Sequence, residues 1–303
     1  MRTRCGAVWA VLAAAGAARA QFAGTVTAGG VEFDLAVQAP FPNMGPMLLR
    51  PSNLVSVAEP GMSQLNQYVW YYYLPGDPRA YNFNDSGGQE VQVVGNTITV
   101  TQHYAGWDGI QTYALSSSGA RTGVLHAQAT VHNLGAAPLS IRLIHYADLD
   151  DNGTFTDDTA RLTGPMAMIV EDTTGPFWLQ WTADTTPAAY QASAWRTLLT
   201  NLANNGQTAL NSTGLPLSAD VTMAWQWDLV VPAGQSAMVG DTIAIREGST
   251  PCYANCDNSS SPPFLNINDF ICFQSYFAQG ASYANCDGST AAPVLNINDF
   301  VCF

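Results

Sequence analysis

Leu125-His-Ala-Gln-Ala-Thr-Val-His132 decides the fold class, because apolar and polar residues alternate without exception along this stretch. A period of two residues is that of a β-strand that buries one face and exposes the other. The same alternation returns after the turn residues Gly135-Ala-Ala-Pro138, over Leu139 to Leu143. The two stretches predict successive strands of a mainly β fold.

Further strands are expected on both sides of this centre. Val31 to Val37 alternates in the same way, and Gly95-Asn96 is a good two-residue hairpin turn between Val91–Val93 and Ile98–Val100. Other strand candidates are Met166–Glu171, Phe177–Thr182, Val221–Val231 and Met238–Ile245. Regular strands separated by Gly, Pro and Asn turns are typical of a β-sandwich. We therefore expect one β-sandwich domain over residues 21–248, which is long enough to bury one large core.

One helix is expected inside this domain. Trp195, Leu198, Leu199 and Leu202 lie on one apolar stripe at helical spacing, and Asn205-Gly206 supplies the stop. Such a helix would pack on an edge of the sandwich or close one of its ends.

The N-terminal residues have the pattern of an export signal. Arg2 and Arg4 precede a run of small apolar residues, and Ala18-Arg-Ala20 fits the small-x-small cleavage pattern. We expect residues 1–20 to be a signal peptide, which leaves a secreted or cell-surface protein that begins at Gln21; an uncleaved anchor is the alternative. No later apolar run reaches the length of about 18 residues that a membrane-spanning helix needs.

The expected mature chain is strongly acidic. Loss of residues 1–20 leaves seven arginines against 23 acids, a formal charge of −16, and the chain has no lysine. This charge argues against nucleic-acid partners and against docking on anionic lipid. It agrees with a protein that binds cations outside the cell.

The C-terminal residues contain one unit written twice. Residues 253–273 return as residues 283–303 with 15 of 21 residues identical, after a linker at Arg246–Pro251, so we expect a small duplicated module over 249–303. Oxygen side chains at alternate positions, followed by an acid and an apolar run, are typical of a calcium loop that leads into a helix. The candidate calcium ligands are Asn255, Asp257, Ser259, Asn266 and Asp269, and in the second copy Asn285, Asp287, Ser289, Asn296 and Asp299.

The cysteines of the mature chain all lie in this module. The repeat predicts the disulfides Cys256–Cys272 and Cys286–Cys302, and it offers no partner for Cys252. An exported chain permits such disulfides. A zinc site is the rival interpretation, which the absence of any Cys-x-x-Cys motif and of a nearby histidine disfavours.

The module resembles dockerin-type repeats, in particular the cysteine-containing variety on exported planctomycete proteins, through Tyr-Ala-Asn-Cys-Asp-Gly-Ser-Thr and Leu-Asn-Ile-Asn-Asp-Phe. The resemblance implies paired calcium loop–helix units that attach the chain to a cohesin-like scaffold or cell-surface partner. The sequence departs from the pattern in three ways: a longer loop, Asn in place of the first loop Asp, and a chain that stops at Phe303, one turn into the second expected helix. The partner-contacting residues that the resemblance implies are Ile267, Asn268, Phe270, Ile297, Asn298 and Phe300.

A second candidate calcium loop lies within the expected sandwich. Asp148-Leu-Asp-Asp-Asn-Gly153 places oxygen side chains on alternate residues and a glycine at the turn. The ligands would be Asp148, Asp150 and Asn152, with Asp157 or Asp158 as the closing carboxylate. The alternative is a solvated acidic turn.

The remaining polar and aromatic residues nominate no catalytic group. The four histidines (His103, His126, His132 and His145) are expected to be ordinary strand residues. Trp70-Tyr-Tyr-Tyr73 and Trp107 could form a sugar-stacking platform, although core packing is favoured. The tryptophans that are expected in the core are Trp178, Trp181, Trp225 and Trp227.

The sequence thus favours an exported, non-catalytic protein with a calcium-binding attachment module. The alternatives are a carbohydrate-binding module, or a polysaccharide-degrading hydrolase, in the sandwich. A hydrolase would need two carboxylates across a cleft, and no motif nominates such a pair.

Overall fold

The computed structural model describes residues 21–28, 31–37, 52–56, 65, 67–83, 89–119, 122–150, 157–171, 177–203, 206–247, 256, 266–281, 284–285 and 292–302. Within these residues the chain is mainly β, as the alternating pattern predicts, and every strand pair is antiparallel. None of the helices in this described part is long and apolar enough to cross a membrane. The expected signal peptide lies outside the described residues.

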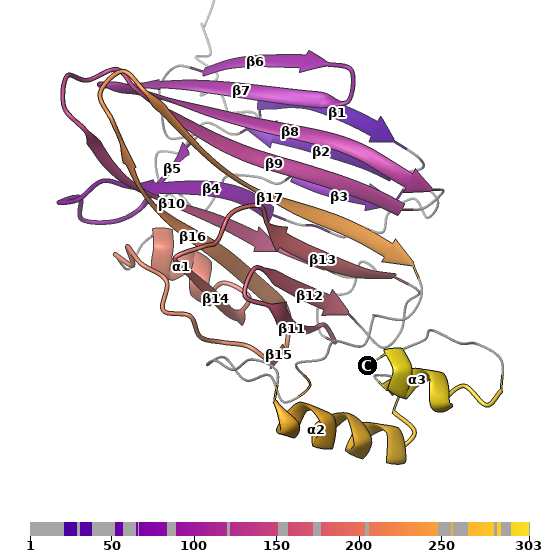
Figure 1. Ribbon diagram of the computed structural model, residues 1–303. Helices are drawn as coiled ribbons and strands as arrows, with labels where there is room; N and C mark the ends of the chain where they lie inside the picture. The colour runs from indigo at the N-terminus through magenta and orange to yellow at the C-terminus, as the bar shows by residue number, and fades with distance from the viewer. Residues whose placement is uncertain are drawn as a thin grey trace, which may run out of the picture.

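The largest sheet has nine strands and forms one layer of the molecule (Figure 1). In spatial order its strands are β15 (Leu217–Ser218), β11 (Thr159–Gly164), β12 (Ala167–Glu171), β13 (Phe177–Ala183), β17 (Ser236–Glu247), β9 (Thr122–Asn133), β8 (Trp107–Gly119), β7 (Thr97–Tyr104) and β6 (Gln89–Val94). Strand β9 contains Leu125–His132, and its residues are alternately buried and half-buried along its whole length.

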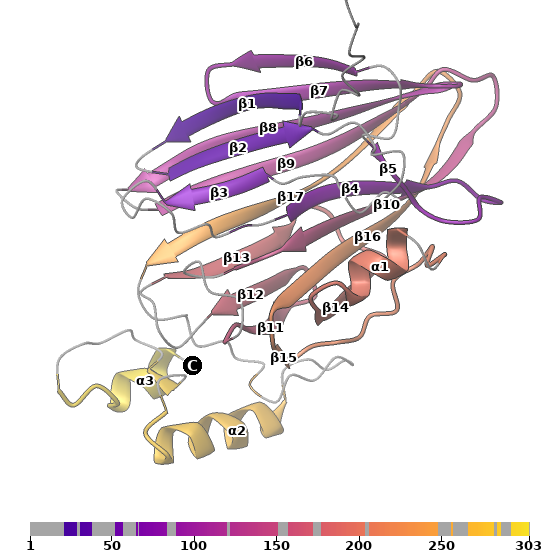
Figure 2. The same ribbon diagram turned by 180° about the vertical axis from the view of Figure 1, so that it is seen from behind.

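Two smaller sheets lie against the nine-stranded sheet (Figure 2). One has five strands, in the order β14 (Ala189–Ala194), β16 (Val221–Val231), β10 (Leu139–Asp148), β4 (Gln67–Tyr73) and β5 (Tyr81–Asn82). The other consists of β1 (Gln21–Ala28), β2 (Val31–Val37) and β3 (Ser52–Ser56). One buried core joins all three sheets, for example through Phe33, Trp70 and Ile243, so the fold is a sandwich with a large sheet on one side.

The expected strands over 31–37, 91–100, 125–143, 166–182 and 221–245 are all present, with ends shifted by up to five residues, the largest shift being at the end of β10. The turn Gly95-Asn96 joins β6 to β7, and the positive φ of Gly95 (57°) suits the primed turns that such hairpins use. Several strands are not predicted by the sequence; on β4 and β8, for example, tyrosines and polar residues break the alternation.

Helix α1 (Thr197–Ala203) covers the outer face of the five-stranded sheet. Leu198, Leu199 and Leu202 are buried there in a second apolar cluster with Tyr71 and other residues of that sheet. Trp195 was expected on the same stripe, but it precedes the helix and is 41% exposed. The Arg196 guanidinium lies 4.2 Å from its ring centre, so the side chain is covered by a cation rather than by the core.

A polar cluster at the centre of the core ties the two layers together. The Asp241 carboxylate, on β17 of the large sheet, accepts hydrogen bonds from the Tyr68 hydroxyl, from Trp181 Nε1 at 2.7 Å and from His145 Nδ1 at 2.5 Å. His145 stacks on the Trp70 ring with 3.7 Å between ring centres, and all five side chains are almost completely buried. Three donors on one carboxylate satisfy a charge that would otherwise be costly to bury.

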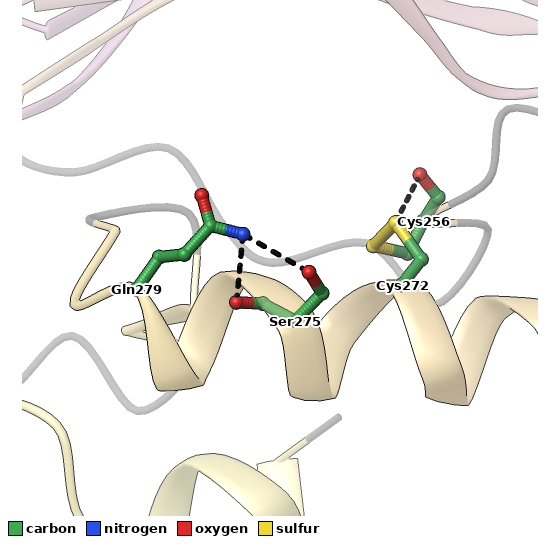
Figure 3. Close-up of a disulfide and its surroundings, with 4 residues drawn as sticks. All are labelled: Cys256, Cys272, Ser275 and Gln279. Carbon is green, nitrogen blue, oxygen red and sulfur yellow. Dashed lines mark hydrogen bonds between the residues drawn. A yellow bond between two sulfur atoms is a disulfide. The ribbon is translucent and has the colours of Figure 1, made fainter.

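The tail contains two further helices, α2 (Ile267–Ala278) and α3 (Ile297–Cys302), at the β11–β15 end of the sandwich (Figures 1 and 2). Phe273 is buried between Phe277 and Phe300, so the two copies of the repeat share one small apolar core. A disulfide joins Cys256 to Cys272 on the second turn of α2, and Figure 3 shows it beside that helix. Cys252, Cys286 and the Cys302 side chain lie outside the described residues.

We expect Asp241→Asn to lower the free energy of unfolding by about 3 kcal/mol, because the amide cannot accept all three buried donors. Urea unfolding monitored by tryptophan fluorescence measures this loss. The matched control is Asp228→Asn, whose half-exposed carboxylate pairs with Arg142 Nε at 2.5 Å and should contribute less than about 1 kcal/mol. Equal losses in the two variants would contradict a structural role for the buried cluster.

Candidate functional site

Three carboxylates converge where β10 ends and β16 begins. Asp148, Asp150 and Asp220 each offer an oxygen, and these oxygens lie within 4.8 Å of one another. The antiparallel register explains the meeting, since Asp148 pairs with Thr222 and the residues just beyond each strand end must then lie side by side. Asp148 is completely buried and the other two are half-buried.

The electrostatics of this acidic cluster are unfavourable in the absence of a positive charge. Burial, and after it the charge of Asp220, raises the pKa of Asp150 to about 6. Burial also raises the pKa of Asp220. Hard carboxylate oxygens at this separation are the donors that Ca²⁺ prefers, so the residues present fit such an ion.

The cluster includes only part of the ligand set predicted from Asp148–Gly153. Asn152 lies outside the described residues. Asp158 is buried, and its carbonyl oxygen accepts a hydrogen bond from the Ala219 amide at 3.0 Å, beside Asp220. Its carboxylate does not belong to the group of converging oxygens. Asp220 was missed, because only strand pairing, not sequence spacing, brings it to Asp148.

Four of the predicted ligands of the tail repeats act as helix caps. Asn266 Oδ1 accepts from the Asn268 amide at 2.8 Å, and Asp269 Oδ2 accepts from the Asn266 amide at 2.6 Å. The second copy repeats both contacts, with Asn296 Oδ1 bonded to the Asn298 amide at 2.8 Å and Asp299 Oδ2 to the Asn296 amide at 2.7 Å. These are reciprocal capping boxes.

Asn285 is buried, and the other predicted calcium ligands of the tail lie outside the described residues; they are Asn255, Asp257, Ser259, Asp287 and Ser289. Calcium binding by the repeats therefore stays a prediction.

The predicted partner-contacting residues lie mostly at the surface of the tail. Ile267 and Ile297 occupy equivalent positions in the two copies and are 68% and 73% exposed. Asn268, Asn298 and Phe270 are exposed as well. Phe300 differs from its counterpart, because it is half-buried against Phe273 and Phe277.

A small pocket opens between the two layers at the edge of the sandwich, and we call it the Tyr190 pocket. Its volume is about 260 Å³. Its walls are Leu162, Tyr190, Ser212, Thr213, Gly214, Leu215 and Pro216. Tyr190 belongs to the edge strand β14, and none of the lining side chains is charged.

A second pocket, of about 340 Å³, lies between β16 and β17. It is lined by Thr185, Thr186, Ala188, Trp227, Asp228, Leu229, Met238 and Val239. Asp228 is the one acid in this wall, and Arg142 pairs with it at 2.5 Å.

The histidines form no shared site in the described part of the chain. His103 contacts Asp108 at 2.8 Å, His126 contacts Asp184 at 2.6 Å, and His132 contacts Ser236 at 2.8 Å. Each pair is exposed on its own part of the large sheet, and His145 is buried in the core.

The proposed sugar-stacking platform is core instead. Trp70, Tyr71 and Trp107 are all at most 3% exposed. Tyr72 packs among the core aromatics, with its ring centre 5.1 Å from that of Trp107. The core assignment of Trp178, Trp181, Trp225 and Trp227 is confirmed.

Comparison with known proteins identifies a fold but no family. No family model and no curated protein matches the sequence. A solved bacterial glucoamylase in complex with acarbose has a TM-score of 0.51 and 9% identity, over 89% of this chain and 41% of that one. A putative aldose 1-epimerase from Escherichia coli K12 has a TM-score of 0.45 and 8% identity, over 74% of this chain and 98% of that one.

The chain spans less than half of the glucoamylase chain. At 9% identity this likeness shows the fold alone.

We expect Asp150→Asn to stabilise the calcium-free protein at pH 7.5 by about 1–2 kcal/mol, and by roughly half as much at pH 5. The folded-state pKa of Asp150 is raised to about 6, so the cost of its ionisation is complete above that pH and is lost progressively as the pH falls from about 6 toward the ordinary aspartate pKa of about 3.9. Thermal unfolding in EDTA at both pH values measures the difference. A matched control is Asp77→Asn, in a turn outside the cluster. A stabilisation that does not change with pH would contradict the assignment.

Proposed function

We propose that this chain is a carbohydrate-associated, non-catalytic protein whose sandwich binds a saccharide in the Tyr190 pocket. The observation that carries the proposal is the lining of this pocket, which combines a half-buried phenol ring, the Ser212 and Thr213 hydroxyl groups and no charge. An aromatic face with nearby hydroxyl groups suits a sugar ring, whose C–H face is apolar and whose rim is polar. The fold likeness to a glucoamylase solved with acarbose is consistent with this role but identifies no site.

Binding is favoured over hydrolysis by the placement of the carboxylates. Glycoside hydrolysis uses two carboxyl groups on opposite sides of the sugar, about 5–9 Å apart. The Tyr190 pocket contains none, and the second pocket contains Asp228 alone. The acidic cluster at Asp148 lines neither of these pockets, and its crowded oxygens suit a cation better than a sugar.

The mature protein should be retarded in native gels that contain a neutral polysaccharide, tested with soluble starch, dextran, mannan, xylan and β-1,3-glucan. Tyr190→Ala should abolish the retardation, because the ring that stacks on the sugar is lost. Tyr73→Ala is the control, since this half-buried tyrosine lies three strands away on β4. Retention of full binding by Tyr190→Ala would exclude this pocket.

The tail supports a second function, attachment to a protein partner. The two copies share a core and expose isoleucines at equivalent positions, and a disulfide links Cys256 to Cys272 in the first copy. A duplicated apolar surface is therefore open to a partner. The dockerin resemblance makes a cohesin-like or cell-surface protein the proposed partner and export the proposed localisation. Calcium is the proposed cofactor, held by the loops of the repeat and by Asp148, Asp150 and Asp220.

Native mass spectrometry of EDTA-treated protein should detect up to three bound ions as calcium is added. We expect Asp220→Asn to remove one ion, and Asp257→Ala and Asp287→Ala to remove one each.

Binding to an immobilised cohesin domain should require calcium. It should weaken at least tenfold in the double variant Ile267→Asp and Ile297→Asp, since an aspartate buried at the interface would be unpaired. Val230→Asp, on the sandwich surface, is the control. Absence of bound calcium at millimolar concentration would contradict this second function.

A further inference from the structure

The Tyr190 pocket lies at an open end of the sandwich rather than along a sheet face. Tyr190 is on β14, the edge strand of the five-stranded sheet, and Leu162 is on β11, next to the edge of the large sheet. Both side chains pack partly against the main core, so the floor of the pocket is fixed by the sandwich itself. The loop Ser212–Pro216 forms the remaining wall.

This loop is anchored to β14 by its backbone. The Ser212 amide donates to the Tyr190 carbonyl at 2.7 Å, and the Ala192 amide donates to the Thr213 carbonyl at 3.0 Å. Gly214 has a φ of +99°, and a Cβ atom there would lie 1.9 Å from the Ala192 carbonyl oxygen, so only glycine fits. Ser212 also adopts a positive φ of 54°, which costs a non-glycine residue about 1 kcal/mol. The wall is therefore held in place before any ligand binds.

The size of the pocket limits what can enter it. Its volume of about 260 Å³ is below the range of about 300–1,000 Å³ that is usual for drug-sized ligands. One sugar ring fits such a space, whereas several consecutive residues of a chain do not. A single compact pocket at an edge accepts the end of a glycan chain more readily than its middle.

The lining also selects against charge. None of its side chains is cationic, so an anionic sugar would lose hydration without gaining a partner. The chain as a whole carries a formal charge of −13, which repels anions further. Uronic acids and sulfated sugars are therefore disfavoured.

We propose that the Tyr190 pocket recognises the terminal residue of a neutral glycan. This inference rests on the proposed saccharide-binding function and adds the part of the ligand that is bound, namely one uncharged ring at a chain end. The Tyr190 ring stacks on the sugar, and the hydroxyl groups of Tyr190, Ser212 and Thr213 lie around its rim.

The test compares chain lengths of the polysaccharide that the gel assay identifies. Isothermal titration with its oligosaccharides of two, three, four and six residues should give dissociation constants that agree within about twofold per mole of chain, because each chain has one such end. The corresponding terminal uronic acid should bind at least tenfold more weakly. Tyr190→Phe keeps the ring and loses one hydroxyl group, and it should weaken binding about tenfold.

The outcomes separate this inference from the function on which it rests. If affinity rises tenfold or more between two and six residues, an internal stretch is bound, and the chain-end inference fails while saccharide binding stands. Equal binding of the uronic acid overturns the selection for neutral sugars in the same way. If no polysaccharide retards the protein in the gel, or if Tyr190→Ala still binds, the proposed function fails, and this inference fails as well.

Discussion

One buried carboxylate holds the two layers of this sandwich in a single arrangement. Asp241 on the large sheet accepts hydrogen bonds from Trp181 on its own sheet and from Tyr68 and His145 on the facing sheet. Apolar side chains tolerate small shifts of one layer over another, but a buried charge with three donors does not. The Asp241 contact therefore fixes how β4 and β10 lie over β13 and β17.

Strand β10 contributes residues both to this buried contact and to the acidic cluster. Its inner face contributes His145 to the buried contact, and its C-terminal end places Asp148 opposite the start of β16. Burial lowers the pKa of His145 despite the nearby Asp241 carboxylate. The imidazole is therefore neutral and donates from Nδ1, which leaves Nε2 without a hydrogen-bond partner among the described residues. The histidine thus serves the packing of the layers and takes no part in a surface site.

The sequence predicts the sandwich well wherever one face of a strand is buried, as on β7 and β9. It does not predict contacts that depend on which strands pair, and so Asp220 and Asp241 were not recognised. The tail shows a second limit. Asn266-Ile-Asn-Asp269 has the residue types of a calcium loop and also those of a capping box. In a calcium loop the side-chain oxygen atoms coordinate the ion, and in a capping box they accept hydrogen bonds from backbone amides at the start of the helix. Local pattern alone cannot separate the two uses.

The disulfide gives the tail a different maturation requirement from the sandwich. The sandwich has a large core that needs no covalent help, whereas the core shared by α2 and α3 consists of a few aromatic and aliphatic side chains. Units with so little buried area generally depend on cross-links, and the Cys256–Cys272 bond persists only under oxidising conditions. The redox state of the compartment in which the chain folds therefore controls whether the tail becomes rigid.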